Sequence, residues 1–158
     1  MAKVPMTVAG AERLKSELHR LKTVERPAVV QALADARSHG DLSENADYDA
    51  AKDRQGFIEG RIAEVESRLA NAQIIDPSAI DADGRVVFGA TVEIEDLETG
   101  ERRSYQIVGD DEADIKAAKI SVNSPIARAL IGKTEGDTAE VEAPGGLRSF
   151  EIRSVGYA

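Results

Sequence analysis

The chain has 158 residues, of which none is cysteine or tryptophan and only two are histidine. Without cysteine it cannot form disulfide bonds, use a thiolate nucleophile or build a cysteine-based zinc site. His19 and His39 stand 20 positions apart, one inside a helical pattern and one beside a polar turn. We therefore expect neither histidine to be a metal ligand.

Long apolar segments are also missing. No stretch reaches the roughly 18 consecutive apolar residues of a membrane-spanning helix, and no basic segment leads into an apolar one at the N-terminus. We expect a cytoplasmic protein without membrane contact. Hydrophobic residues make up 42% of the chain and charged residues 31%, as in an ordinary globular protein.

Negative charge is in excess, but unevenly. Residues 1–75 carry 11 lysines and arginines against 12 acidic residues, whereas residues 76–158 carry 9 against 17. Nucleic acid attracts basic surfaces, and the second half is acidic. We therefore do not expect nucleic acid to be the obvious partner of the second half.

Two segments of the first half repeat apolar residues at alternating steps of three and four, which is typical of helices packed along one stripe. They comprise Leu14, Leu18, Leu21, Val24 or Glu25, Ala28, Ala32 and Leu33 in the first segment, and Ile58, Ile62, Val65, Leu69 and Ala72 in the second. A short connection joins them, so the two stripes can bury each other only in an antiparallel helical hairpin. A helix of about 28 residues is on the order of 40 Å long.

Two proline positions set expectations for the ends of these helices. Pro27 lies inside the first pattern, where it removes a backbone donor and clashes with the preceding turn. We predict a kink or a break there, followed by a shift in the phase of the apolar stripe toward Val29, Val30 and Leu33. The second helix is predicted to end near residues 71–75, because Asp76 and Pro77 follow.

Between the two helical segments lies the polar turn HGDLSENADYDAAKDRQ, residues 39–55, which contains Asp41 and Glu44. At the tip of a rod both carboxylates are solvated and lack the convergent groups of a pocket. Two carboxylates also cannot supply the roughly six oxygen ligands that Mg²⁺ or Ca²⁺ takes. The simplest interpretation is that the rod delivers these carboxylates to the active site of a partner.

A structural interpretation of the same turn competes with this one. Ser43 followed by Asn45 and Ala46, or Asp41 followed by Glu44, fits an N-cap or capping box that opens the second helix. Such caps are common, and acidic residues suit a helix N-terminus. Spacing alone therefore favours capping over function.

The second half changes to a period of two, which indicates strands joined in an antiparallel sheet. The predicted strands are Thr91–Leu97, Arg103–Val108, Ala139–Ala143 and Ser149–Val155, with turns at residues 99–100 and 144–146. A short helix from Pro125 to Ile131 is framed by Ser124 and Gly132. We predict an α+β protein of two domains, with the hairpin in residues 1–75, a linker in 76–84 and the sheet domain in 85–158.

Four segments resemble one family. They are GDLSENADY (40–48), AKDRQGFIEGRI (51–62), VGDDEADIK (108–116) and ISVNSPIARALIGKTEGD (120–137). They are similar to the Gre transcript-cleavage factors of bacterial RNA polymerase, specifically those of the GreA type. The resemblance covers both halves in the family's order and spans nearly the whole chain.

The resemblance implies an FKBP-like C-terminal domain that docks on the rim of the secondary channel of bacterial RNA polymerase, with Asn123, Ser124 and Pro125 at the docking loop. The hairpin of a monomeric factor would enter this channel and stimulate the polymerase's own cleavage of backtracked RNA, without an active site or a cofactor of its own.

Individual tip residues acquire roles by the same resemblance. Asp41 and Glu44 would help hold the second, weakly bound Mg²⁺ of the polymerase active site and orient a water. Leu42 would pack against elements of the channel. Arg37 and Lys52 would form a basic patch that contacts the 3′ end of the nascent RNA, and Arg54 could join them.

Three alternatives stay open. Ser43 stands where many family members carry a lysine, which removes a positive charge that could contact RNA. The further acids Asp47 and Asp49 raise the alternative of a Gre-like inhibitor that plugs the channel, although they follow the GDLSEN turn and do not replace it. A coiled-coil scaffold on the polymerase would need neither Asp41 nor Glu44. FKBP-like folds can also be prolyl isomerases, but such a pocket needs an aromatic lining and the chain has three Phe and three Tyr.

Overall fold

The computed structural model describes residues 3–38 and 45–157, which form two compact units, residues 11–72 and residues 3–10 together with 73–157. Its elements in chain order are β1 (Val4–Thr7), α1 (Val8–Arg20), a π-helical turn (Leu21–Glu25), α2 (Arg26–Ser38), α3 (Ala46–Ala70), β2 (Ala72–Ile75), a 3₁₀ turn (Pro77–Ala79), β3 (Thr91–Asp96), β4 (Arg102–Val108), 3₁₀ turns (Asp110–Glu112 and Ile115–Ala117), β5 (Lys119–Ser121), α4 (Pro125–Leu130), β6 (Thr138–Ala143) and β7 (Gly146–Gly156). Among the helices of these ranges, none is long and apolar enough to cross a membrane.

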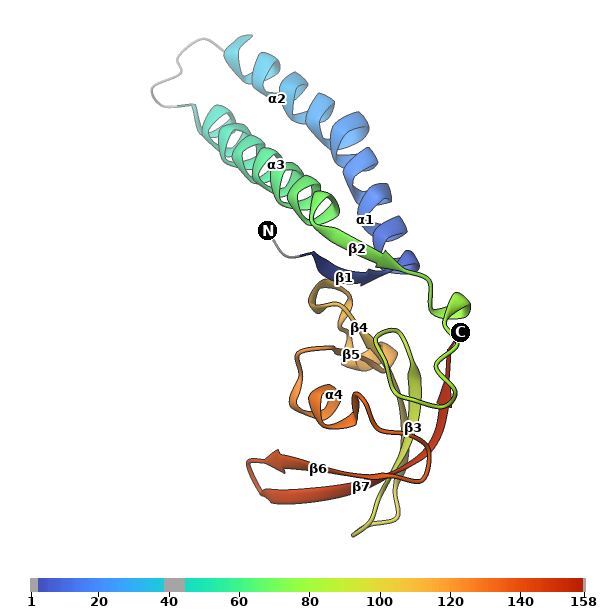
Figure 1. Cartoon of the computed structure of the whole chain (residues 1–158). Helices are drawn as coiled ribbons and strands as arrows, with labels where there is room; N and C mark the ends of the chain where they lie inside the picture. Colours follow the sequence, from blue (N-terminus) through green and yellow to red (C-terminus); the bar gives the residue numbers. More distant parts are fainter. Residues whose placement is uncertain (1–2, 39–44, 158) are drawn as a thin grey trace. The chain divides into compact units, whose positions relative to one another are not determined.

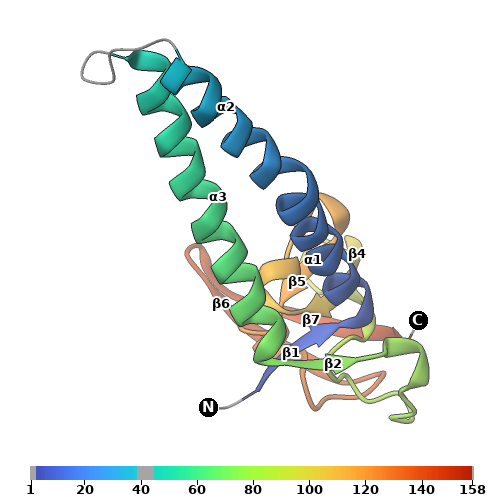
Figure 2. The same cartoon turned by 90° about the horizontal axis from the view of Figure 1, so that it is seen from above.

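The first unit is a helical hairpin, as predicted. Helices α2 and α3 run side by side in both ribbon views (Figures 1 and 2). The centre of their contact is a cluster of buried side chains, namely Leu21, Val29, Ile58 and Ile62, with Leu18 packed against it. Helix α3 ends at Ala70, just before the predicted range, because the next residues form strand β2.

The interruption expected near Pro27 is confirmed. The five residues of the π-helical turn end directly before α2, and the backbone N–H of Arg26 donates to the carbonyl of Leu21. Pro27 is the second residue of α2, directly after this wide turn, and it has no N–H to donate to the preceding turn. The wide turn thus separates two regular helices without a loop.

The wide turn also changes which residues face α3. A π turn holds more residues than an α turn, so the apolar stripe advances along the sequence. After the turn the buried residues are Val29, Leu33 and Ala36. Four positions predicted to face inward are instead exposed, namely Val24, Ala28, Val30 and Ala32.

Charged side chains link the two arms of the hairpin outside its apolar stripe. The linking pairs are Arg61 with Glu17, Arg26 with Glu59, Arg54 with Glu25 and Lys22 with Glu66. Exposed pairs of this kind stabilise modestly, but four of them between the arms oppose sliding of one arm past the other.

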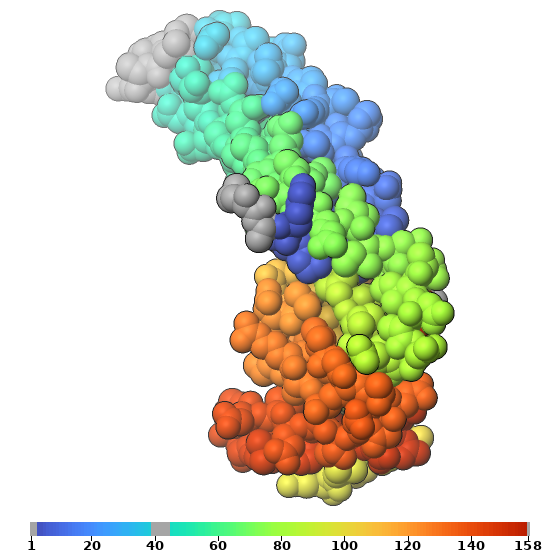
Figure 3. All heavy atoms as spheres, viewed as in Figure 1, coloured from blue at the N-terminus to red at the C-terminus, as the bar shows by residue number. Residues whose placement is uncertain are grey.

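The second unit contains a five-stranded sheet in the order β5-β4-β3-β7-β6. The predicted antiparallel sheet is confirmed for β3, β4, β6 and β7, and the short strand β5 joins its edge parallel to β4. Helix α4 packs near β6, and their atoms lie beside one another in Figure 3, in orange and red. The core consists of buried residues from the sheet and from α4, including Val92, Ile107, Ala127, Leu130, Ala139 and Ile152.

The N-terminal residues belong to this second unit. Strand β1 pairs with β2 in a separate two-stranded sheet. The buried carboxylate of Glu112 accepts hydrogen bonds from the backbone N–H groups of Thr7 and Gly109, both at 3.0 Å, and from the Thr7 hydroxyl. The Thr7 hydroxyl oxygen in turn accepts from the N–H of Gly10 at 3.1 Å. We call these four residues the Glu112 cluster.

Candidate functional site

The tip of the hairpin is the first candidate site. The predicted tip residues Asp41, Leu42 and Glu44 lie outside the described residues, as does the rest of 39–44. The structure describes both sides of this segment, which are the last turn of α2 and the first turn of α3. These flanking turns show which residue caps α3.

Asn45 is the N-cap of α3. Its side-chain Oδ1 accepts from the N–H of Tyr48 at 3.0 Å, and its backbone is extended, as an N-cap requires. The third helical residue, where a capping box places its acid, is Tyr48. The interpretation that Ser43 is the N-cap, or that Asp41 and Glu44 form a capping box, concerns residues outside the described ranges, whereas the cap that the structure describes is Asn45.

The same Asn45 side chain also reaches the other arm. Its Nδ2 donates to the carbonyl oxygen of Ala36, in the last turn of α2, at 2.7 Å. One amide thus satisfies an unpaired N–H at the start of one helix and an unpaired carbonyl near the end of another. The sequence interpretation named Asn45 only as part of a possible cap and missed this second bond.

The basic residues near the tip differ in their surroundings. The Arg37 guanidinium lies over the ring of Tyr48, 5.9 Å from its centroid, which is a cation–π distance. Lys52, one helical turn beyond Tyr48, donates to Gln55 at 3.4 Å and is exposed. Arg54 is instead held by Glu25 at 2.7 Å. Arg37 and Lys52 are consequently better placed than Arg54 to meet an anion.

The electrostatics of the first turn of α3 fit its acidic sequence. Asp47 and Asp49 lie in this turn, where negative charge interacts favourably with the helix dipole. Within residues 3–38 and 45–157, no three His, Asp or Glu side chains come together as metal ligands. The two acids therefore have a structural explanation in this helix, independent of any ligand.

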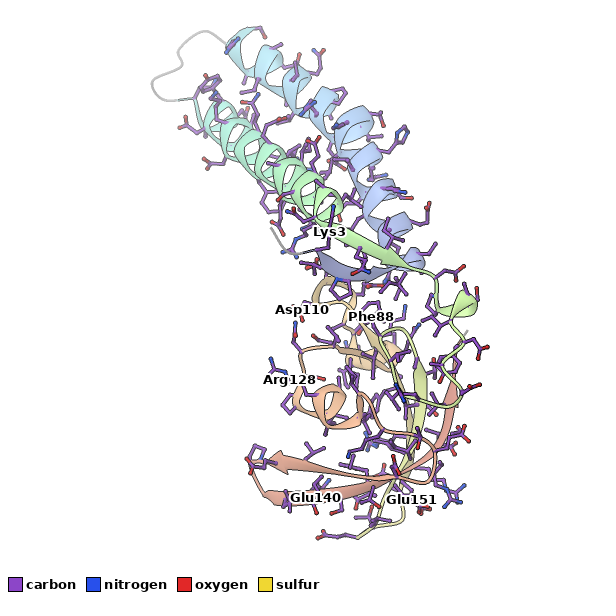
Figure 4. The ribbon with its side chains drawn as sticks, viewed as in Figure 1. Lys3, Phe88, Asp110, Arg128, Glu140 and Glu151 are labelled. Carbon is purple, nitrogen blue, oxygen red and sulfur yellow. The ribbon has the colours of Figure 1, made fainter. Side chains whose placement is uncertain are left out.

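The loop before α4 is the second candidate site. Ser124 caps α4 by accepting from the N–H of Ala127 at 3.3 Å, and Pro125 is the first helical residue. Asn123 Nδ2 donates to Asp110 Oδ2 at 2.9 Å, and the Ser121 hydroxyl donates to the same carboxylate. Asp110, labelled in Figure 4, lies in the turn after β4. The structure thus joins two of the motifs that were singled out in the sequence.

An apolar groove of about 430 Å³ runs beside this loop. Ser124 and Pro125 line it together with Ile115, which is 69% exposed, and with Phe150. Phe150 is the one aromatic among its described lining residues, which does not favour the enclosed aromatic pocket of a prolyl isomerase. Sequence reasoning missed the groove, because it forms only where α4 meets β6 and β7.

Comparisons with known proteins bear on both sites. Residues 4–74 match the family described as "Transcription elongation factor, N-terminal", and residues 81–157 match "Transcription elongation factor, GreA/GreB, C-term". The chain is 68% identical to a transcription elongation factor GreA of Ralstonia nicotianae and 66% identical to one of Neisseria meningitidis, each over 99% of both chains. A GreA factor homolog 1 structure from Thermus thermophilus is 33% identical, with a TM-score of 0.43, over 97% of this chain and 98% of that one. The chain belongs to the GreA/GreB family of transcription elongation factors.

Proposed function

We propose that this elongation factor stimulates transcript cleavage by bacterial RNA polymerase. Its hairpin would enter the secondary channel of a backtracked enzyme, and the tip would complete the polymerase's own site for cleaving the extruded RNA 3′ end. Removing this end returns an arrested complex to synthesis. The proposal makes the factor a stimulator of the polymerase and gives it no independent active site.

The observation that carries the proposal is the assignment of the N-cap of α3 to Asn45. Before that assignment, capping was a sufficient explanation of Asp41 and Glu44. With Asn45 in the cap position and Tyr48 at the third helical position, neither acid is needed to start the helix. The two carboxylates then need another explanation, and coordination in a partner's site supplies one.

The length of the hairpin suits delivery over a distance. Helix α3 has 25 residues, which at 1.5 Å per residue gives about 37 Å. The ion pairs Arg61 with Glu17 and Arg26 with Glu59 join its arms, each through two hydrogen bonds of 2.8 Å or less. Bidentate pairs fix geometry better than single contacts, so the rod can hold its tip in place.

Asp41 and Glu44 would contribute carboxylate oxygens to a Mg²⁺ ion that the polymerase binds weakly by itself. That ion, when bound, stabilises charge on the attacking and leaving oxygens of the cleaved phosphodiester bond. Arg37 and Lys52 would hold the phosphates of the RNA 3′ end, and Leu42 would contact the channel wall. These contributions are positioning and charge, which the factor can supply without a pocket.

The second unit would dock the factor on the rim of the channel. Asn123, Ser124 and Pro125 form a rigid edge, since Asp110 anchors Asn123 and Ser124 caps α4. The adjoining apolar groove offers area to bury against a partner. Docking by one unit would raise the effective concentration of the hairpin in the channel.

The test is cleavage of nascent RNA in a backtracked elongation complex with Mg²⁺. Asp41→Asn and Glu44→Gln remove charge while keeping side-chain shape, and each should abolish stimulated cleavage. Both should still displace labelled wild-type factor from the polymerase. Normal cleavage by both variants would overturn the proposal, and slowed synthesis by the wild-type factor would identify an inhibitor instead.

A further inference from the structure

One side chain connects the two arms of the hairpin directly below the tip. Asn45 Oδ1 accepts from the N–H of Tyr48 in α3, and its Nδ2 donates to the carbonyl of Ala36 in α2 at 2.7 Å. Aspartate and serine cap helices about as well as asparagine does. Only the amide combines a carbonyl acceptor with an N–H donor on one rigid group. The bond to Ala36 is therefore a feature of asparagine that capping does not require.

A second contact crosses between the same two turns. Arg37, the residue after Ala36, places its guanidinium over the half-buried ring of Tyr48. Both links join the last turn of α2 to the N-terminus of α3. We call Ala36, Arg37, Asn45 and Tyr48 the tip clasp.

The clasp fixes both ends of the segment that carries Asp41 and Glu44. Binding costs less ordering entropy when the two arms already stand at their bound spacing. We propose that Asn45 is a positioning residue, whose bond to Ala36 holds the arms at the spacing at which the two carboxylates meet the polymerase-bound Mg²⁺. This inference rests on the proposed function for its consequence, but the clasp itself can be tested without polymerase.

Substitutions at position 45 can separate the clasp from the cap. Asn45→Asp keeps an N-cap acceptor for Tyr48 but replaces the donor with a carboxylate oxygen that faces the Ala36 carbonyl. Asn45→Ser also keeps a capping oxygen and adds no charge. Gln31→Glu is the matched control, because it likewise turns an amide into an acid and removes a 2.9 Å bond to Asp35, but within α2.

The first experiment measures the spacing of the arms in the free full-length protein. Because the chain has no cysteine, Ala34→Cys and Asp49→Cys provide two unique, exposed sites for spin labels. The distance distribution between the labels should be narrow with Asn45 and with Gln31→Glu. It should broaden with Asn45→Asp and with Asn45→Ser, and an unchanged distribution in both would overturn the clasp.

The second experiment measures cleavage by backtracked polymerase at saturating factor and varied Mg²⁺. Loss of one hydrogen bond should slow cleavage by roughly fivefold at limiting Mg²⁺, with recovery at high Mg²⁺ and unchanged affinity for polymerase. A loss that Mg²⁺ does not relieve, accompanied by weaker polymerase binding, would mean a merely structural role and would overturn the inference. If the wild-type factor itself fails to stimulate cleavage, the proposed function falls, while the spin-label distances still decide on the clasp.

Discussion

At the scale of single residues, Glu112 is a buried carboxylate with several hydrogen-bond donors around it. It is only 6% exposed and accepts three hydrogen bonds, two from backbone N–H groups and one from the Thr7 hydroxyl. A buried carboxylate is tolerated when such donors replace its hydration. The cluster attaches β1 to the turn after β4, two segments about a hundred residues apart in the chain.

Removal of this acceptor should destabilise the second unit. Glu112→Ala leaves the N–H groups of Thr7 and Gly109 without partners, which we expect to cost roughly 2–4 kcal/mol. The free energy of unfolding in urea measures the effect, with exposed Glu140→Ala as the control. Equal stabilities of the two variants would contradict the role given to the cluster.

Two glycine substitutions should have opposite effects on stability. A Cβ on Gly10 would lie 2.3 Å from Cδ of Glu112, and this carboxylate cannot move away without breaking its bonds. A Cβ on Gly60 in α3 would meet no atom within 4 Å. Gly60→Ala should therefore raise the free energy of unfolding by about 0.5–1 kcal/mol, as helix propensity predicts. Gly10→Ala should lower the free energy of unfolding. A stabilising effect of this substitution would show that the Glu112 carboxylate can move aside at little cost.

At the scale of elements, the hairpin shows which features could be predicted from the sequence. Apolar spacing and Pro27 were sufficient to predict two helices and an interruption. The exposure of Val24 was not predictable, because the phase shift depends on where the chain places its π turn. Strand β1 was missed for a related reason, since its partner β2 lies some 65 residues away.

The candidate site likewise has features that could be predicted from the sequence and features that could not. Asp41 and Glu44 could be selected from motif and charge alone, and Ser124 from the pattern that starts a short helix. The bond of Asn45 to Ala36 could not be predicted, because it depends on how α2 and α3 pack. The groove beside α4 likewise needs three elements in place.

The ion pairs between the arms should make the hairpin sensitive to acid. The Arg61 guanidinium lowers the pKa of Glu17, and Arg26 lowers that of Glu59. A carboxylate whose pKa is lower in the folded state stabilises the fold above its unfolded pKa, near 4.5. This contribution disappears as the pH falls through the folded pKa, so the melting temperature should drop below about pH 4.5.

Circular dichroism at 222 nm, recorded between pH 7 and pH 3, follows this loss. A Glu17→Gln, Glu59→Gln variant should lose less stability than the wild type over the same interval, because it has given up both interactions at neutral pH. Parallel melting curves for the two proteins would show that these pairs contribute little, as some exposed pairs do.

At the scale of the whole molecule, the proposed roles of the two units can be separated. Ile115 lines the groove of the second unit and is 69% exposed, so Ile115→Asp should leave stability nearly unchanged. If the groove docks on polymerase, this variant should bind about tenfold more weakly, as expected for losing a buried isoleucine. Cleavage should recover at high factor concentration.

The matched control for that variant is Leu97→Asp, which places the same charge on a half-exposed apolar residue outside the groove. Competition against a labelled wild-type factor measures both affinities. Equal binding of the two variants would exclude the groove from the docking surface, without affecting the role proposed for the tip.

The central claim is that two carboxylates at the tip of the hairpin act inside the polymerase. The most direct measurement is RNA cleavage in a stalled, backtracked bacterial elongation complex with Mg²⁺, comparing the wild-type factor with the Asp41→Ala, Glu44→Ala double variant. We predict rapid trimming of the RNA 3′ end with the wild-type factor and none above background with the variant. Equal stimulation by both proteins, or by neither, would contradict the claim.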